Sequence, residues 1–193
     1  KLGPRVSQVG PATPDHMLQT KRFPLFVRGT PAKITPKNLV SQVNTYAAAH
    51  EKYYLKHKKE GMFMLDPFPK VILIPGVGMV TTGKDLKTAK VVAEVYEHAI
   101  SIMKGASTID QYASLSEELA FEMEYWSMEL YKLSMAPAEA EMSRQIGLVT
   151  GAAGSIGKAI ARKLAQAGAH LVIADLNAEI EAKYVVPNAG IFE

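Results

Sequence analysis

Cysteine is absent from the 193 residues of the chain. Its absence excludes disulfides, thiol catalysis and cysteine-ligated metal sites, and it leaves histidine and carboxylates as protein ligands for a metal. Long apolar runs are also missing. The longest covers residues 71–80 and contains Pro75, Gly76 and Gly78, so no bilayer-spanning helix is expected. The N-terminal residues lack the apolar core of a signal peptide, which favours a cytoplasmic protein.

Neither sign of charge dominates, because 22 Lys and Arg face 19 Asp and Glu for a net charge of +3. An apolar fraction of 48% is typical of a globular protein. The basic residues gather in residues 1–70. They could contact a phosphate backbone, but lysines on a solvated helix face are the commoner explanation. Since no nucleic-acid-binding motif accompanies this charge, we expect no nucleic-acid partner.

The first 85 residues combine proline-rich stretches with one clear helix and one clear strand. Residues 1–34 hold five prolines without a sustained period, which predicts irregular structure. Thr35 and Pro36 suit the start of a helix, which should run to Gly61. The apolar run at 70–75 predicts a buried strand, followed by a glycine-rich turn that reaches Gly83.

Two amphipathic helices are expected next. One should cover residues 84–104 and stop at Gly105. The other should begin after Ser114-Leu-Ser-Glu117, which fits a capping box, and should bury a single apolar face made of Leu119, Met123, Trp126, Leu130 and Leu133. Pro137 and the polar residues 139–144 then separate two predicted domains, 1–143 and 144–193.

The most specific local pattern is a strand at 146–149, a turn at 150–157, a helix from about Ile156, and a second strand at 171–175. It predicts a βαβ unit, with Ile156, Ile160 and Leu164 on one face of the helix. Glycines at 151, 154 and 157 would let the backbone approach a pyrophosphate at the helix N-terminus. Asp175 would accept hydrogen bonds from a ribose, which favours NAD over NADP. A plain loop, with Asp175 as a turn residue, is the alternative.

The same segment resembles the short-chain dehydrogenase/reductase family, whose members open with this Thr-Gly turn and carry an Asn-Ala-Gly motif that residues 188–190 match. Ser155 stands where many members have the middle glycine, and Pro187 stands where the family usually has an asparagine. The resemblance and the turn together assign NAD binding to Thr150, Gly151, Gly154, Ser155, Ile156, Gly157, Asp175, Leu176, Asn188, Ala189 and Gly190.

The spacing after the second strand conflicts with a complete fold of this kind. Only eight residues separate Asp175 from Tyr184, whereas a parallel crossover needs a dozen or more. We therefore expect the chain to be part of a longer polypeptide, with segments missing after about residue 182. The family's catalytic Ser and Tyr-x-x-x-Lys do not follow the nucleotide motif, so the catalytic residues are unknown. The upstream string from Tyr54 to Lys58 is interpreted as ordinary helix.

Several short sequence motifs precede this segment, and their order is informative. They are Thr13-Pro-Asp-His16, Thr20-Lys-Arg22, residues 71–79, Tyr96-Glu-His98 and Met123-Glu-Tyr-Trp126. Together with the fusion point, they resemble the bifunctional rhamnulose-1-phosphate aldolase/alcohol dehydrogenase proteins. The resemblance implies an α/β chain, in which an incomplete class II aldolase/adducin-like domain precedes an incomplete Rossmann domain with a doubly wound parallel sheet. It also implies a homo-oligomer that acts on sugar-phosphate and small aldehyde substrates.

The implied chemistry is cleavage of rhamnulose 1-phosphate to dihydroxyacetone phosphate and lactaldehyde, followed by oxidation of lactaldehyde with NAD. Class II aldolases use a divalent metal, usually zinc, held by three histidines. Here no His-x-His pair occurs, and Pro75-Gly76 stands where single-domain relatives place a histidine before a glycine. His16 is the best candidate ligand, with Asp15 as a possible orienting partner, and a surface histidine is the alternative.

Three cations are candidates for binding the substrate phosphate, namely Lys21, Arg22 and Lys84, with simple solvation as the alternative. His98 follows Glu94 by one helical turn and suits either a metal ligand or an ion pair. Two other functions stay open for the whole protein. One is a dehydrogenase whose aldolase-like domain is inactive, and the other is a non-enzymatic adducin-like assembly module.

Overall fold

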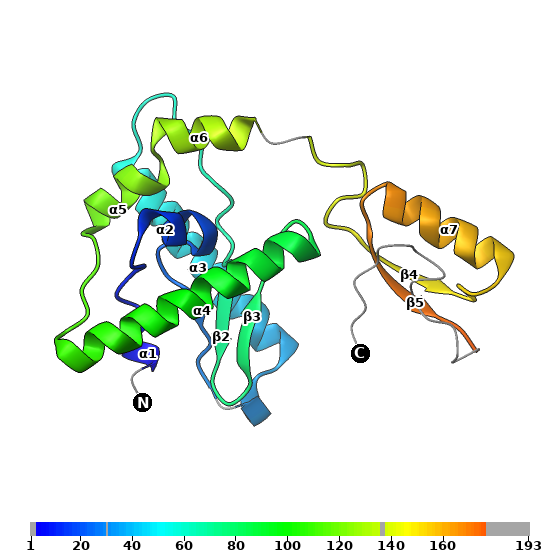
Figure 1. Ribbon diagram of the computed structural model, residues 1–193, viewed down its shortest axis with the longest axis horizontal. Helices are drawn as coiled ribbons and strands as arrows, with labels where there is room; N and C mark the ends of the chain where they lie inside the picture. Colours follow the sequence, from blue (N-terminus) through cyan, green and yellow to red (C-terminus); the bar gives the residue numbers. More distant parts are fainter. Residues whose placement is uncertain (1–2, 30, 136–137, 177–193) are drawn as a thin grey trace. The chain divides into compact units, whose positions relative to one another are not determined.

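The computed structural model describes residues 3–29, 31–135 and 138–176. The chain divides into two compact units (Figure 1). Unit 1 comprises Lys1–Gly83 and Lys87–Met135, and unit 2 comprises Lys84–Leu86 and Ala136–Glu193. Within the described ranges, every helix is too short or too polar to cross a membrane.

Unit 1 is mainly helical around a small sheet. Its helices are α1 (Gly3–Val6), α2 (Pro14–Thr20), the 3-10 turn η1 (Pro31–Lys33), α3 (Pro36–His57), α4 (Leu86–Ile109), α5 (Glu117–Glu124) and α6 (Ser127–Ser134). Its strands are β1 (Leu25–Phe26), β2 (Val71–Ile74) and β3 (Gly78–Thr81). They form a sheet in the order β1-β2-β3, in which β1 runs parallel and β3 antiparallel to β2.

Local signals predicted two of these elements correctly. Helix α3 begins where expected because the Thr35 hydroxyl accepts a hydrogen bond from the Asn38 N–H and Pro36 occupies the first helical turn. The helix ends at His57, before the expected stop at Gly61. Strand β2 lies within the apolar run predicted for it, and Val71 is fully buried. The glycine-rich segment that follows β2 was predicted as a turn. Part of it forms β3, which pairs with β2 in antiparallel orientation.

Other expectations for unit 1 were wrong. The proline-rich N-terminus forms α1, α2 and β1, because Pro14 sits in the first turn of α2 and Thr13 caps it by accepting from the His16 N–H. Gly105 does not end α4. A glycine lowers helix stability by only about 1 kcal/mol, and α4 continues for another turn to Ile109.

The helix predicted after residue 117 is split in two. Its N-cap is Ser116, and α5 ends where the Tyr125 N–H turns back to the Phe121 and Met123 carbonyls. The predicted apolar face is consequently not the core: Leu119 is 51% and Trp126 is 48% exposed. Phe121 and Tyr125 are buried instead, and they pack with Tyr54 of α3.

The core of unit 1 lies between α4 and the sheet. Val92, Tyr96, Ala99 and Met103 of α4 pack with Val71 of β2 and with Tyr112. The segment after α4 is fastened to the N-terminal segment, because the Tyr112 hydroxyl donates to the Gly10 carbonyl at 3.0 Å and the Ser114 hydroxyl donates to the Pro11 carbonyl at 2.6 Å.

Unit 2 contains the predicted strand, helix and strand, namely β4 (Ile146–Thr150), α7 (Ser155–Gln166) and β5 (His170–Ala174). The two strands pair in parallel. Val149, Ala152 and Ala161 form the core, with Leu164, Leu171 and Ile173 packed against it. Within the described residues two strands lie beneath α7. Of the predicted helix face, Leu164 packs on this core, whereas Ile156 and Ile160 are 76% and 49% exposed.

Candidate functional site

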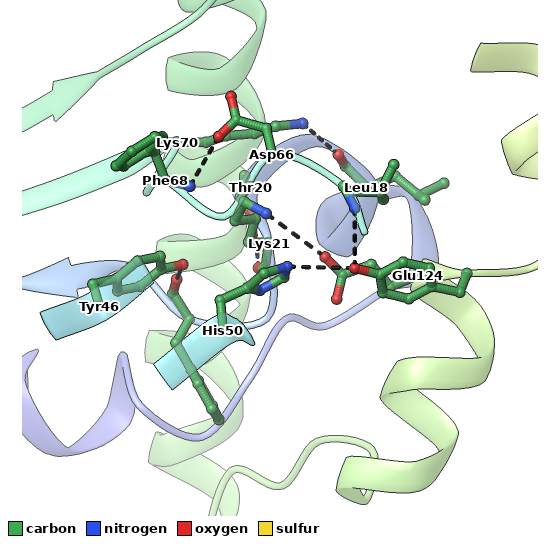
Figure 2. A network of polar contacts seen from close by, with 12 residues as sticks. Leu18, Thr20, Lys21, Tyr46, His50, Asp66, Phe68, Lys70 and Glu124 are labelled. Carbon is green, nitrogen blue, oxygen red and sulfur yellow. Dashed lines mark hydrogen bonds and ion pairs between the residues drawn. The ribbon is translucent and has the colours of Figure 1, made fainter. Parts of the chain in front are cut away.

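Buried charges gather in unit 1 where α2, α3, α5 and the start of β2 meet. We call Lys21, His50, Lys70 and Glu124 the buried charged cluster. Figure 2 shows Lys21, His50 and Glu124 converging from three separate elements. Lys21 caps the end of α2 with a positive φ of 64°, and its N–H donates to the Met17 carbonyl. This strained turn directs the side chain inward.

The contacts within the cluster are close but loosely paired. Lys21 Nζ lies 3.9 Å from Glu124 Oε1, and the two residues are 5% and 2% exposed. Lys70 Nζ donates to the Leu18 carbonyl at 2.8 Å (Figure 2). Tyr53 places its hydroxyl beside the same carboxylate. The buried Glu124 is thus surrounded by two lysines and a phenol.

Burial sets the electrostatics of the cluster. It raises the pKa of Glu124, while the nearby Lys21 and Lys70 oppose that rise. It lowers the pKa of both lysines, against the attraction of Glu124. Burial, and next the charge of Lys21, lowers the pKa of His50 to about 4. Opposed pKa shifts of this kind occur at catalytic sites and also in structural ion clusters.

A tyrosine hydroxyl lies beside the His50 ring. The Tyr125 hydroxyl lies 3.4 Å from His50 Nε2 and also accepts from the Leu65 N–H at 3.3 Å. Burial raises the pKa of Tyr125, so its phenol stays protonated at neutral pH.

A second group of charges surrounds Glu117 at the edge of the cluster. Arg22 Nη1 donates to Glu117 Oε2 at 2.9 Å, and Lys56 Nζ donates to Oε1 at 2.7 Å. His57 Nε2 also lies 2.9 Å from Oε1. These contacts, that of His57 first, lower the pKa of Glu117 to about 2. Arg22, Lys56 and His57 together form a partly exposed anion-binding site. The Glu117 carboxylate occupies this site.

The predicted phosphate-binding cations therefore have different surroundings. Lys21 faces Glu124 in the core, and Arg22 binds Glu117 while its guanidinium lies 4.6 Å from the centre of the Phe23 ring. Lys84 is exposed and belongs to unit 2. The structure brings Lys21 and Arg22 to one region of unit 1. Their binding to phosphate stays a prediction.

The predicted metal ligand His16 is buried on α2, with 7% of its surface exposed. Its ring lies beside that of His98 on α4, at 5.4 Å between ring centres. Among the described residues, His16 Nδ1 has no hydrogen-bond partner. Across the same residues, no group of three or more His, Asp or Glu side chains is arranged to hold a metal ion.

The glycine-rich turn of unit 2 has the geometry that its glycines demand. Gly151 has a φ of +62°, and Gly154 precedes the first residue of α7 without a side chain to cap the helix. A Cβ at Gly157 would overlap the Gly151 carbonyl oxygen and would lie 3.0 Å from the Ala152 Cα. The turn therefore packs directly on the first turn of α7 and leaves the amide groups there without a side-chain cap.

Asp175 holds this turn from the end of β5, because its Oδ2 accepts a hydrogen bond from the Ala153 N–H at 2.8 Å. Thr150 ends β4 and Ser155 begins α7, so both lie at the same turn. Leu176 is fully exposed. The predicted residues between 150 and 176 thus lie around the turn that follows the C-terminal ends of β4 and β5. Asn188, Ala189 and Gly190 lie outside the described residues.

Sequence reasoning missed the acidic residues of unit 1. Glu117, Phe121 and Glu124 are separated by four and three residues, so they share one face of α5. The available signal was a helix face with a glutamate at each end and an aromatic residue between them. The more apolar face that begins at Leu119 obscured this signal.

The family described as "Aldolase class II, second domain" matches residues 3–133. A Bacillus subtilis (strain 168) protein named "Uncharacterized oxidoreductase YuxG" is 43% identical over 180 residues, which are 91% of this chain and 26% of that protein. The "4-formylbenzenesulfonate dehydrogenase TsaC1/TsaC2" of Comamonas testosteroni is 55% identical over 38 residues, 20% of this chain and 15% of that protein. The chain thus spans about a quarter of the first relative. No solved structure matches significantly.

Proposed function

Because this chain belongs to the family of class II aldolase second domains, we propose that it is part of a longer enzyme with an aldolase half and an NAD-dependent dehydrogenase half. One observation carries the proposal. A single chain joins the aldolase-family segment to a βαβ unit whose turn needs glycine at positions 151 and 157. The oxidoreductase name of the Bacillus subtilis relative supports the second half.

In the dehydrogenase half, the turn at 150–157 would bind the pyrophosphate of NAD. Its backbone is close to α7 because Gly157 has no Cβ, and the uncapped amides of α7 are suitable donors to a phosphate. Asp175 would accept hydrogen bonds from the ribose while it holds the Ala153 amide. A carboxylate there disfavours the 2′-phosphate of NADP.

In the aldolase half, the substrate would be a ketose 1-phosphate, with rhamnulose 1-phosphate as the specific proposal. Cleavage would give dihydroxyacetone phosphate and lactaldehyde, and the dehydrogenase half would oxidise the lactaldehyde. Arg22 would bind the substrate phosphate by exchanging its contact with Glu117 for a bidentate one. Lys21, behind it in the core, would add positive charge. Lys84, an exposed residue of unit 2, is a separate candidate for contacting a substrate phosphate.

A divalent metal, zinc in the first instance, is also proposed for the aldolase half. When bound, it would polarise the substrate carbonyl and stabilise the enediolate. His16 fits one ligand position, because its buried Nδ1 has no protein partner among the described residues. A three-histidine set does not form within them. The second candidate, a dehydrogenase whose aldolase-like domain lacks metal chemistry, rests instead on Pro75, which stands where single-domain relatives place a histidine.

The test uses the full-length polypeptide that carries this chain. Calorimetric titration should show NAD binding, and Gly157→Ala should abolish it because the new Cβ overlaps the turn. Gly105→Ala, at an open position on α4, is the matched control and should bind NAD as the parent does. Unchanged affinity in Gly157→Ala would contradict the assignment of the nucleotide site.

Turnover separates the remaining candidates. Release of dihydroxyacetone phosphate from rhamnulose 1-phosphate, together with NADH formation from lactaldehyde, is the expected result. NADH formation without cleavage would identify the dehydrogenase with an inactive aldolase-like domain. A homo-oligomer that catalyses neither reaction would instead indicate an assembly module.

A further inference from the structure

Aromatic rings hold two of the three bases of the anion-binding site in place. The guanidinium of Arg22 lies 4.6 Å from the centre of the Phe23 ring and 5.6 Å from the centre of the Tyr53 ring. The His57 ring lies 5.7 Å from the Tyr53 ring and 5.4 Å from the Phe121 ring, between ring centres. These contacts do not involve the glutamate that occupies the site. Arg22 and His57 are therefore positioned without it.

We propose that Arg22, Lys56 and His57 bind the phosphate group of a ligand, and that Glu117 is an internal competitor which leaves the site when the ligand binds. Lys56, His57 and the competing role of Glu117 are new, and they rest on the proposed assignment of Arg22 to a phosphate. Inorganic phosphate can bind without turnover, so this proposal and the aldolase proposal can fail separately.

Glu117 can leave the site while α5 stays folded. It is the first residue of that helix, and its side chain is 37% exposed, so rotation about side-chain bonds can carry the carboxylate into water. The helix start is secured by Ser116, whose hydroxyl accepts from the Leu119 N–H. Exposed ion pairs contribute little in water. The contacts that Glu117 gives up are therefore weak enough for a ligand to replace them.

Glu117 neutralises only part of the positive charge. Arg22 and Lys56 each carry one positive charge, and His57 adds a third when it is protonated. The pKa of Glu117 is about 2, so this residue supplies a single negative charge at neutral pH. A phosphate group carries about two negative charges there. It matches the two permanent cations and favours the protonated form of His57.

One donor of the site is unused while Glu117 occupies it. The Arg22 guanidinium donates to Glu117 through Nη1. Arg22 Nε is buried and has no hydrogen-bond partner among the described residues. A phosphate group has more acceptor oxygens than a carboxylate, which favours it as the partner of a guanidinium with a donor to spare.

The site is accessible from solvent on the side of Lys56, whose side chain is 65% exposed. Exposed neighbours along the chain carry more positive than negative charge; they are Glu51, Lys52, Lys58, Lys59 and Glu60. An excess of one sign of charge raises the local concentration of the opposite ion. Anions are thus attracted to the open side of the site.

The experiment is a calorimetric titration of the full-length polypeptide with inorganic phosphate, in a phosphate-free buffer at constant ionic strength. Glu117→Gln removes the competitor and should tighten binding about fivefold, whereas Lys56→Gln should weaken it about fivefold. Glu122→Gln and Lys52→Gln are the matched controls, because they remove the same charges at exposed positions of α5 and α3. Both should bind as the parent does. Urea unfolding midpoints should verify that all four variants fold.

A second titration with dihydroxyacetone phosphate identifies the source of the phosphate group. Opposite responses of Glu117→Gln and Lys56→Gln to both ligands would support a site for phosphate monoesters. The same responses to inorganic phosphate alone would support a site for the free anion.

Three results would overturn the proposal. They are an absence of phosphate binding by the parent protein, an unchanged or weaker affinity in folded Glu117→Gln, or equal effects of Lys56→Gln and Lys52→Gln. Turnover is a separate readout. Ketose cleavage with phosphate affinities that ignore these substitutions would remove this proposal alone, whereas the expected affinities without cleavage would remove the aldolase proposal alone.

Discussion

Acidification should destabilise unit 1 through His50. Burial lowers the pKa of this histidine in the folded chain to about 4, from 6.5. Between these two pH values the unfolded chain binds a proton that the folded chain does not, so the free energy of unfolding falls as the pH falls. The stability that His50 contributes is complete above pH 6.5 and is lost by about pH 4.

The size of this effect follows from the same values. A pKa near 4 against 6.5 corresponds to about 3 kcal/mol, at about 1.4 kcal/mol for each pH unit. That is a large part of the net stability of a small domain, which is typically about 5–15 kcal/mol. The physical cause is the confinement of the imidazole beside Lys21, in a core where a second positive charge has poor solvation.

Urea unfolding at several pH values between 7.5 and 4 would measure this linkage. The single tryptophan, Trp126, lies in unit 1 and reports its unfolding by fluorescence. His50→Gln should flatten the dependence on pH by about 3 kcal/mol. His170→Gln, at a histidine of unit 2, is the control and should leave the pH dependence of the unfolding of unit 1 as it is. Equal slopes in His50→Gln and in the parent protein would refute the reasoning.

Three further predictions concern stability. Glu117 has a pKa of about 2, so the stability it contributes is present above pH 4.5 and is lost as the pH falls toward 2. Glu117→Gln should remove this acid dependence and cost less than about 1 kcal/mol at pH 7, because the carboxylate is partly exposed; an unchanged acid dependence would contradict the assigned contacts. Gly105→Ala should raise the free energy of unfolding by about 0.5–1 kcal/mol, since a Cβ there meets nothing within 4 Å; a lower melting temperature would contradict this. Gly10→Ala should lower it by about 1–3 kcal/mol, because Gly10 has a φ of +127° and its Cβ would lie 2.7 Å from Ser114 Oγ. Gly3→Ala, with open space around it, is the control in the same denaturation series.

Elements with local causes were predictable from the sequence. Thr35 and Pro36 start α3 through contacts within one turn, and the βαβ unit follows from strand, glycine turn and helix signals that are contiguous in the chain. The break between α5 and α6 was not predictable in this way. Apolar residues continue at helical spacing across it, and only packing determines that Phe121 and Tyr125 are buried while Leu119 is not.

The candidate sites depend even more on long-range contacts. Hydrophobicity assigns Lys21 and Glu124 to the surface. Opposite charges that only the fold brings together, across 103 residues for this pair, make their burial tolerable. The contact between His16 and His98 has the same origin. The glycines of the nucleotide turn are different, because their requirement is local and the sequence pattern already contained it.

The hydrogen bonds from Tyr112 and Ser114 to the N-terminal segment have a consequence for how the protein is made. They join residues that are 102 and 103 positions apart. A ribosome adding about 5–20 residues per second needs roughly 5–20 s to synthesise the intervening chain. During that interval Gly10 and Pro11 have been synthesised, but Tyr112 and Ser114 have not. The N-terminal segment therefore reaches its final position only after α4 is complete, and the folding of unit 1 is mainly a late event in its synthesis.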